Sequence, residues 1–227
     1  MISSFVRLLF IGFVSLGLFG SLTRPCALDW VRWRGPDLNG ISRETGWLTK
    51  WPDDGPKRLW KAKVGTGFSS LAVANGNVYT LGNSGRGRGE EKDTMFCFDA
   101  ATGKVIWSYV YEAKLDPKYY DGGPSGTPTV DGDRVYTLSK HGMLICLDTA
   151  DGHVVWQKNV ASETRAKRPT WGFAGSPFVI GGTLFVNVGA HGTRSTKRAA
   201  RFSGAPAVKP LVTRPLCPTF ETDGRSW

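Results

Sequence analysis

Residues that build cross-links and metal sites are scarce in this chain of 227 residues, which has four cysteines and three histidines. The histidines lack the close pairing and added cysteine or carboxylate ligands of a zinc site. The phosphate-binding phrase Gly-Lys-Ser/Thr is missing. The main apolar run, residues 8–20, has thirteen residues, and a membrane-spanning helix needs about 20. These absences argue against a zinc protein, a P-loop protein and an integral membrane protein.

Charge of one sign is in excess, with a net charge of +10 from 29 Lys and Arg against 19 Asp and Glu. Half of this excess lies in residues 194–227, where seven basic and two acidic residues give +5, and Arg7 and Arg24 add two more. Residues 28–193 therefore hold only +3, with no basic stripe or RNA-binding phrase. This distribution predicts no nucleic-acid partner.

One phrase occurs twice in the chain, 49 residues apart: Asp99-Ala-Ala-Thr-Gly103-Lys-Val-Ile-Trp107 returns as Asp148-Thr-Ala-Asp-Gly152-His-Val-Val-Trp156. An upstream phrase, Gly-Thr-Pro at residues 126–128, returns at the same spacing as Gly-Ser-Pro at residues 175–177. A period of this length indicates stacked units of supersecondary structure.

Each phrase is typical of two strands joined by a short hairpin. Its Asp can accept hydrogen bonds from turn amides, and its Gly supplies the positive φ that such a turn needs. Its Trp follows on the outgoing strand, where it can pack against a neighbouring unit. One unit then has four short strands, at residues 69–73, 77–81, 95–98 and 105–109. The structural positions that the repeat predicts are Asp99, Gly103, Trp107, Asp148, Gly152 and Trp156.

These phrases, and the Val-Tyr strands before them, resemble the pyrroloquinoline-quinone-like (PQQ-like) repeat β-propellers. This superfamily contains quinoprotein alcohol dehydrogenases and the outer-membrane assembly lipoprotein of the bacterial β-barrel machinery. The opening Trp30-Val-Arg-Trp33 is similar to the first segment of large exported bacterial propellers. The resemblance implies an all-β fold, a partial β-propeller built from four-stranded antiparallel blades over residues 65–193.

The number of units is small for a propeller. Four to eight blades close a ring, so even four blades of this length need about 196 residues, whereas residues 65–193 comprise 129. The chain holds about two and a half blades, and we interpret it as a truncated or frameshifted fragment of a longer protein.

Residues 1–27 are predicted to be a signal peptide, because Arg7 precedes the apolar run and small residues follow it. Cleavage after Gly20 or Ala27 leaves no stable membrane span and places the protein in the periplasm or cell envelope. An uncleaved anchor or a buried strand is the alternative. Residues 28–64 then form an N-terminal segment before the blades.

Residues 194–227 break the pattern where a third Asp-Gly-Trp phrase is due. Their Arg-rich and Pro-rich composition without strand periodicity is typical of a disordered tail. A frameshift is the other explanation, because the codons from Thr193 onward permit Ala-Leu-Asp-Lys-Thr-Ser-Gly-Lys-Val-Leu-Trp in a shifted reading frame. Resequencing the DNA around codon 193 distinguishes the two.

Several groups have both a structural and a functional interpretation. The Gly-rich residues 85–91 are interpreted as a solvated hairpin loop, since no helix follows to bind a phosphate. Asp148 and Asp151 are assigned to a turn and not to an acid–base pair. The three histidines are interpreted as turn residues instead of metal ligands: His141, His153 and His191.

Residues 167–173, Lys-Arg-Pro-Thr-Trp-Gly-Phe, mix basic and aromatic side chains. They are either a binding surface on a propeller face or only a connection between blades. Cys97 and Cys146 occupy the same position in successive units. Packed sheets lie about 10 Å apart, too far for a disulfide, so both are predicted to be buried apolar residues. Cys217 has no obvious partner, and Cys26 lacks the small apolar residues that lipidation requires.

The resemblance to quinoprotein dehydrogenases implies an acidic calcium cluster, a general-base Asp, a vicinal disulfide and a Trp under the cofactor. No residue of this sequence can be assigned to these roles, so we predict no catalytic, cofactor-binding or metal-binding residue and no cofactor. The expected function is a non-catalytic binding or scaffold role in an exported protein, with proteins or small ligands as partners. A fragment of a quinone-dependent alcohol dehydrogenase, using pyrroloquinoline quinone and calcium, is the alternative.

Overall fold

A computed structural model describes residues 28–46, 48–85, 91–188 and 192–196 of the chain. Four features predicted from the sequence therefore lie wholly or largely outside the described residues. They are the signal segment 1–27, most of the Gly-rich loop, His191, and the tail from residue 197 onward.

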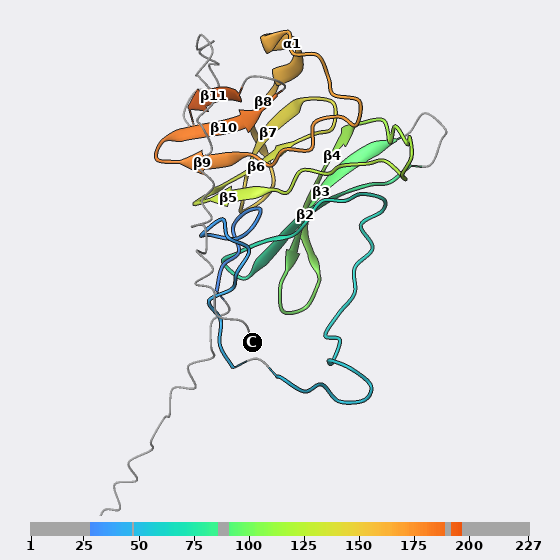
Figure 1. The fold of residues 1–227 in the computed structure, drawn as a ribbon, viewed down its shortest axis with the longest axis vertical. Helices are drawn as coiled ribbons and strands as arrows, with labels where there is room; N and C mark the ends of the chain where they lie inside the picture. The colour runs from blue at the N-terminus through green and yellow to red at the C-terminus, as the bar shows by residue number, and fades with distance from the viewer. Residues whose placement is uncertain (1–27, 47, 86–90, 189–191, 197–227) are drawn as a thin grey trace, which may run out of the picture.

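Almost all regular structure in the described residues is antiparallel sheet (Figure 1). The first sheet has the strand order β1-β2-β3-β4 and the second the order β5-β6-β7-β8, while the third has three strands in the order β11-β10-β9. The predicted fold class, an all-β partial propeller of four-stranded antiparallel units, is confirmed. The strands are β1 Ala72–Ala74, β2 Asn77–Asn83, β3 Lys92–Asp99, β4 Val105–Glu112, β5 Thr129–Asp131, β6 Arg134–Leu138, β7 Met143–Asp148, β8 Val154–Asn159, β9 Phe178–Ile180, β10 Thr183–Asn187 and β11 Gly192–Thr196.

The strands of the first unit follow the predicted positions with shifted ends. β1 starts at Ala72 instead of residue 69, while β3 and β4 are each longer than predicted. β1 and β2 are joined by Asn75-Gly76, whose φ values of 52° and 74° fit the two-residue turn that suits a hairpin. β11 runs to Thr196 and so crosses the predicted boundary at residue 193 between blades and tail.

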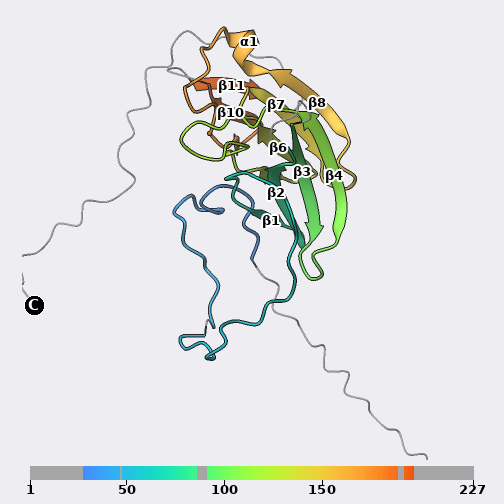
Figure 2. The same cartoon turned by 90° about the vertical axis from the view of Figure 1, so that its right-hand side faces the viewer.

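One short helix among the described residues, α1 (Val160–Thr164), was not expected from the sequence. The Asn159 side chain caps it by accepting a hydrogen bond from the Ser162 amide at 3.1 Å. The helix follows β8 and leads into the connection to β9, so it lies at one end of the second sheet (Figure 2).

The sheets pack face to face around two hydrophobic cores. The first core joins the first and second sheets, and Tyr79 and Met95 meet Val135 and Ile145 in it. The second core joins the second and third sheets, where Tyr136 and Leu144 lie in one cluster with Leu184. Figure 2 shows the outer strands β4 and β8 along one side of this stack and β1 toward the other. The arrangement is that of successive propeller blades.

The repeated Trp and Gly form the contact between neighbouring units. The Trp107 indole N–H donates to the carbonyl of Thr149 in the next unit at 2.9 Å. Its ring lies on Gly152, where an added Cβ would stand 2.5 Å from the ring. Gly152 also has a φ of +75°, so both the turn and the indole require a glycine.

A third copy of this contact involves Trp60, which the sequence had not singled out. Its indole N–H donates to the carbonyl of Ala100 at 2.9 Å, and an added Cβ on Gly103 would stand 2.5 Å from its ring. Trp60 therefore packs against the first unit in the same way that Trp107 packs against the second unit. The signal that was available is Lys-Arg-Leu-Trp at residues 57–60, which parallels Lys-Val-Ile-Trp at residues 104–107.

The opening residues 30–32 cross the innermost strands of all three sheets. Trp30 pairs with Val73 of β1, with nitrogen-to-oxygen distances of 2.8 and 2.9 Å in the two directions. The carbonyl of Val31 accepts from the Val130 amide in β5 at 2.8 Å. Arg32 Nη1 then donates to the carbonyl of Val179 in β9 at 3.2 Å. Residues 30–32 therefore connect the inner edge strands of the three sheets through hydrogen bonds.

Candidate binding site

The repeat Asp residues organise their own turns. Asp99 Oδ1 accepts from the amide of Thr102 at 2.7 Å and from its hydroxyl at 2.6 Å. These hydrogen bonds hold the pKa of Asp99 below its usual value. Asp148 accepts from the Ala150 amide at 2.9 Å and also pairs with Arg134. Both carboxylates are engaged in structure.

The β7–β8 hairpin brings three potential ligand groups together. One ligand atom each of Asp148, Asp151 and His153 lies within 4.8 Å of the others. Asp151 Oδ1 is already bonded to His153, accepting from its amide at 3.0 Å and lying 2.7 Å from its Nδ1. The backbone N–H of His153 is the main reason that the pKa of Asp151 is lowered. The hydrogen bonds are those of a turn, and the absence of a metal stays a prediction.

Cys97 and Cys146 are buried, free and paired across the sheet with the repeat Trp residues. Burial raises the pKa of Cys97 to about 11 and that of Cys146 to about 12. Thiols with such pKa values are protonated at neutral pH and are poor nucleophiles. The prediction that both residues act as buried apolar side chains is confirmed.

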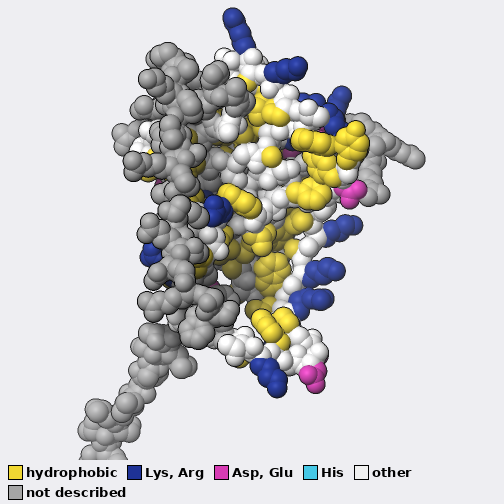
Figure 3. All heavy atoms as spheres, in the orientation of Figure 1, with side chains coloured by type: hydrophobic (Ala, Val, Ile, Leu, Met, Phe, Trp, Pro, Cys, Tyr) yellow, Lys and Arg dark blue, Asp and Glu magenta, His cyan; other side chains and the backbone are white. Residues whose placement is uncertain are grey.

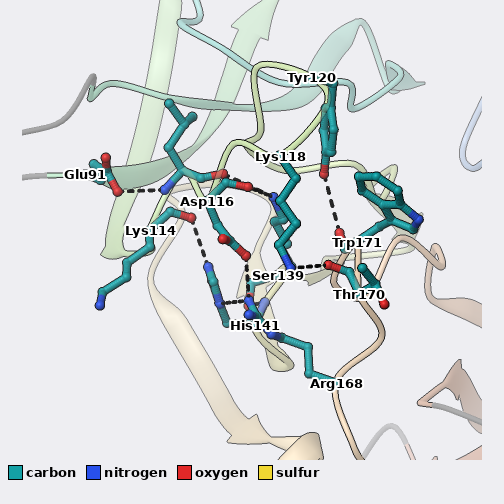
Figure 4. A network of polar contacts seen from close by, with 12 residues as sticks. Glu91, Lys114, Asp116, Lys118, Tyr120, Ser139, His141, Arg168, Thr170 and Trp171 are labelled. Atoms are coloured by element: carbon teal, nitrogen blue, oxygen red, sulfur yellow. Dashed lines mark hydrogen bonds and ion pairs between the residues drawn. The ribbon is translucent and has the colours of Figure 1, made fainter.

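Three connections between strands meet at one end of the stack and form what we call the loop face. They are residues 113–128 between β4 and β5, residues 139–142 between β6 and β7, and residues 165–177 between α1 and β9. The Phe173 amide donates to the carbonyl of Lys140 at 3.0 Å, joining the second and third connections. Figure 4 shows the polar contacts that link all three.

Lys140 is the buried centre of the loop face, with a relative exposure of 2%. Its Nζ donates to the carbonyls of Leu115 at 3.1 Å and Asp116 at 2.8 Å. The ammonium also lies 5.0 Å from the centre of the Tyr120 ring, a cation–π contact. Lys140 thus holds the connection 113–128 against the second unit.

Arg168, at the rim of the loop face, links its own connection, residues 165–177, to the other two connections. Its Nη1 lies 3.0 Å from Asp116 Oδ2 and 2.9 Å from His141 Nδ1. His141 Nε2 lies 2.9 Å from the carbonyl of Lys114. A carbonyl can only accept, so Nε2 carries the proton and Nδ1 accepts from Arg168. These contacts fix the tautomer of His141 as a structural one (Figure 4).

Partial burial would raise the pKa of Asp116, but the positive charges of Arg168 and Lys140 outweigh it and lower that pKa. A lowered pKa in the folded state stabilises the protein above the unfolded pKa of about 3.9 and loses this effect as the pH falls through the folded value. We expect acid unfolding of the wild type to include this loss, of less than about 1 kcal/mol for an ion pair whose side chains are 38% and 24% exposed. Asp116→Asn should remove that component when unfolding free energies are compared between pH 5 and pH 2.5; an unchanged pH dependence would contradict it.

Three aromatic side chains lie beside these charges. Trp171 contacts Tyr119 with ring centroids 5.5 Å apart and Tyr120 at 5.8 Å. Tyr119 is 93% exposed and Trp171 is 45% exposed. Lys118 Nζ donates to the carbonyl of Thr170 at 2.9 Å, which holds a cation next to the exposed rings.

Basic residues dominate the loop face. Its three connections contain six basic residues against Asp116 and Asp121, a net charge of +4. Residues 28–193 together carry a net charge of only +3. The rest of that region is therefore close to neutral. The basic residues are Lys114, Lys118, Lys140, Arg165, Lys167 and Arg168.

The sequence identified only part of this surface. Arg168 and Trp171 of the predicted segment 167–173 lie on it, whereas Phe173 is 2% exposed and belongs to the second core. Asp116, Tyr119 and Tyr120 were missed, because they come from a connection about 50 residues earlier that has no periodic pattern. Only the fold brings the two segments together.

The described residues do not fit a quinone cofactor with calcium. The inner edges of the sheets, which would face a central channel, are hydrogen-bonded to residues 30–32. The one group of described side chains with metal-ligand spacing lies in the β7–β8 hairpin. No reaction step through such a cofactor can be built from these residues. In the described part of the chain, no helix combines the length and apolar character needed to cross a membrane.

Comparisons with known proteins found both solved structures and a family model. The solved structures include a europium-containing methanol dehydrogenase (15% identity, TM-score 0.49, 64% of this chain covered) and BamB from Moraxella catarrhalis (19% identity, TM-score 0.41, 58% covered). A quinohemoprotein alcohol dehydrogenase from Comamonas testosteroni has 21% identity and a TM-score of 0.45, with 61% of this chain covered. The matches cover 26%, 34% and 20% of those three proteins, respectively.

The comparison with curated proteins found no match. A family model described as outer membrane protein assembly factor BamB matches residues 44–123 and 110–203, which together are more than half of the chain. With the repeat contacts above, this match assigns the family: the chain belongs to the PQQ-like repeat propellers that this model describes.

Proposed function

We propose that this chain belongs to an exported protein of the bacterial cell envelope that binds other polypeptides and catalyses no reaction. The description of the family model, an outer membrane protein assembly factor, supports a role at the envelope. The predicted signal segment at residues 1–27 supports export. The protein-binding role comes from the chain's own loop face.

The observation that carries the proposal is that exposed aromatic rings and an excess of positive charge occur together on the loop face. Tyr and Trp side chains supply large contact areas and are enriched among the residues that dominate binding energies. Tyr119 and Trp171 are exposed, and the face carries a net charge of +4. A partner segment with acidic and aromatic residues complements both features.

Peptide binding tests this proposal directly. A fluorescently labelled peptide rich in Asp and Glu with one central Tyr should bind the chain in an anisotropy titration, and binding should weaken as salt rises. Trp171→Ala should weaken it by about 30-fold, the size of a hot-spot effect. Trp33→Ala is the matched control, because Trp33 is 54% exposed and lies outside the loop face.

The same peptide with Lys at every acidic position gives the decisive comparison. Equal affinity for both peptides, or an equal loss in the Trp33 and Trp171 variants, would contradict the proposal. No arrangement of the described residues favours the second candidate, a fragment of a quinone-dependent alcohol dehydrogenase.

A further inference from the structure

The two ends of the array carry the two halves of one interface, which the chain already forms twice internally. Each sheet has a trailing face, toward the next sheet, and a leading face, toward the previous one. Tyr79 and Tyr136 lie on trailing faces and are 1% and 0% exposed. Val135 and Leu184 lie on the leading faces that meet them, and both are 0% exposed.

The trailing face of the third sheet is apolar and open in the described structure. Phe185, 49 residues after Tyr136, holds the equivalent position but is 37% exposed. Its ring packs on Phe178, with centroids 6.2 Å apart. Ile180 lies two residues further along β9, on the same face, and is 59% exposed. Within the described residues, this face has no neighbouring sheet of the kind that buries Tyr79 and Tyr136.

The leading face of the first sheet is covered at Val78 and Phe98, which are 7% and 3% exposed, and is open at Leu71. Val78 and Phe98 take the places of Val135 and Leu147 there, and between them and residues 57–64 lies a cavity of about 230 Å³. Figure 3 shows hydrophobic side chains in a hollow on this side of the molecule, beside a row of Lys and Arg. Leu71 lines the cavity and is 50% exposed.

Residues 57–64 have the features of an outer strand without a sheet. Trp60, Ala62 and Val64 are half-buried, whereas Lys61 and Lys63 between them are exposed, the alternation of a strand. Trp60 repeats the contact that Trp107 makes from the outer strand β4. No strand partner of residues 57–64 exists among the described residues.

The third sheet has the opposite deficiency in its described part. β11 corresponds to β3 and β7, each of which is paired with an outer strand, β4 or β8. The described strands of the third sheet end at β11. In addition, Trp156 Nε1 is buried with no hydrogen-bond partner in the described structure, whereas Trp60 and Trp107 each donate to a turn of the following unit.

We propose that a second copy of this chain packs head to tail on the first, with the leading face of its first sheet against the trailing face of the third. Residues 57–64 of the second copy then lie beside β11 of the first as its outer strand. The contact continues the sheet-to-sheet interface already formed twice in each copy. Two copies of three units give six, within the range of about four to eight blades that close a ring. This inference is independent of the proposed function.

The test is the association state of the full chain, measured by light scattering after size exclusion at about 50 µM. We expect a dimer. Leu71→Lys on the leading face and Phe185→Lys on the trailing face should each raise the dimer dissociation constant at least 100-fold, because each places a charge in every interface of the ring. Tyr119→Lys on the loop face is the control and should leave the dimer intact. Circular dichroism checks that the variants keep their sheets, since all three side chains are already exposed.

Mixing the two variants separates this arrangement from a symmetric dimer. A 1:1 mixture of Leu71→Lys and Phe185→Lys chains can form one wild-type interface, so it should regain a dimer that neither variant forms alone. A symmetric dimer through a single patch would not regain it. The proposal is overturned if the wild type is a monomer at this concentration, if either variant still dimerises, or if the mixture does not recover. A monomer would mean that a different polypeptide segment covers these faces.

Discussion

Gly152→Ala is expected to lower the free energy of unfolding by about 2–5 kcal/mol. An alanine at a φ of +75° costs about 1–2 kcal/mol of backbone strain. Its Cβ would also stand 2.5 Å from the Trp107 ring, so the indole must move within a packed interface at a cost of about 1–3 kcal/mol. Any such movement disturbs the hydrogen bond from Trp107 to Thr149.

Gly76→Ala is the matched control for this measurement. Gly76 has a φ of +74°, but an added Cβ there meets nothing within 4 Å. Urea unfolding at one fixed protein concentration compares the two variants, because association changes apparent stability. Equal losses at the two positions would show that backbone strain alone requires Gly152 and that the packing of Trp107 does not.

Lys140→Met is expected to destabilise the fold by about 2–4 kcal/mol, the second largest effect. Methionine keeps the length of the side chain but removes the ammonium, so the carbonyl of Asp116 loses its 2.8 Å donor at a buried site. Hydrogen bonds to charged groups contribute about 1.5–3 kcal/mol each. The cation–π contact with Tyr120 is lost as well.

The loss should concentrate in the loop face. Hydrogen exchange in the Lys140→Met protein should quicken at residues 113–128 and stay unchanged in β2 and β3. Lys118→Met is the control, because Lys118 is exposed and donates one hydrogen bond, to Thr170. It should change stability by less than about 1 kcal/mol. A control variant as unstable as Lys140→Met would refute the role given to burial.

The repeat units could be predicted from the sequence because the patterns that specify them are local. The Asp-x-x-x-Gly turn and the alternating apolar residues around it lie within ten residues of one another, and their recurrence after 49 residues indicates stacking. The same reasoning found Cys97 and Cys146 as buried positions. Trp60 was missed because its segment lacks both the Asp and the three strands that accompany the other copies of the phrase.

The loop face could not be predicted from the sequence. Its members belong to connections without periodicity, and Asp116 and Arg168 are 52 residues apart. Lys140 follows a strand, and its sequence context is that of an ordinary surface lysine. It is nevertheless only 2% exposed, because the connection 113–128 folds over it. No local pattern encodes such a contact.

The sequence by itself determined that this protein is an array of four-stranded units, because turn chemistry and strand alternation act over a few residues and repeat at a fixed period. The tertiary structure alone decided which loops meet, which charges are buried between them, and which sheet faces stay exposed in the described part of the array. Those features depend on how successive sheets pack, and packing joins residues that are distant in the chain.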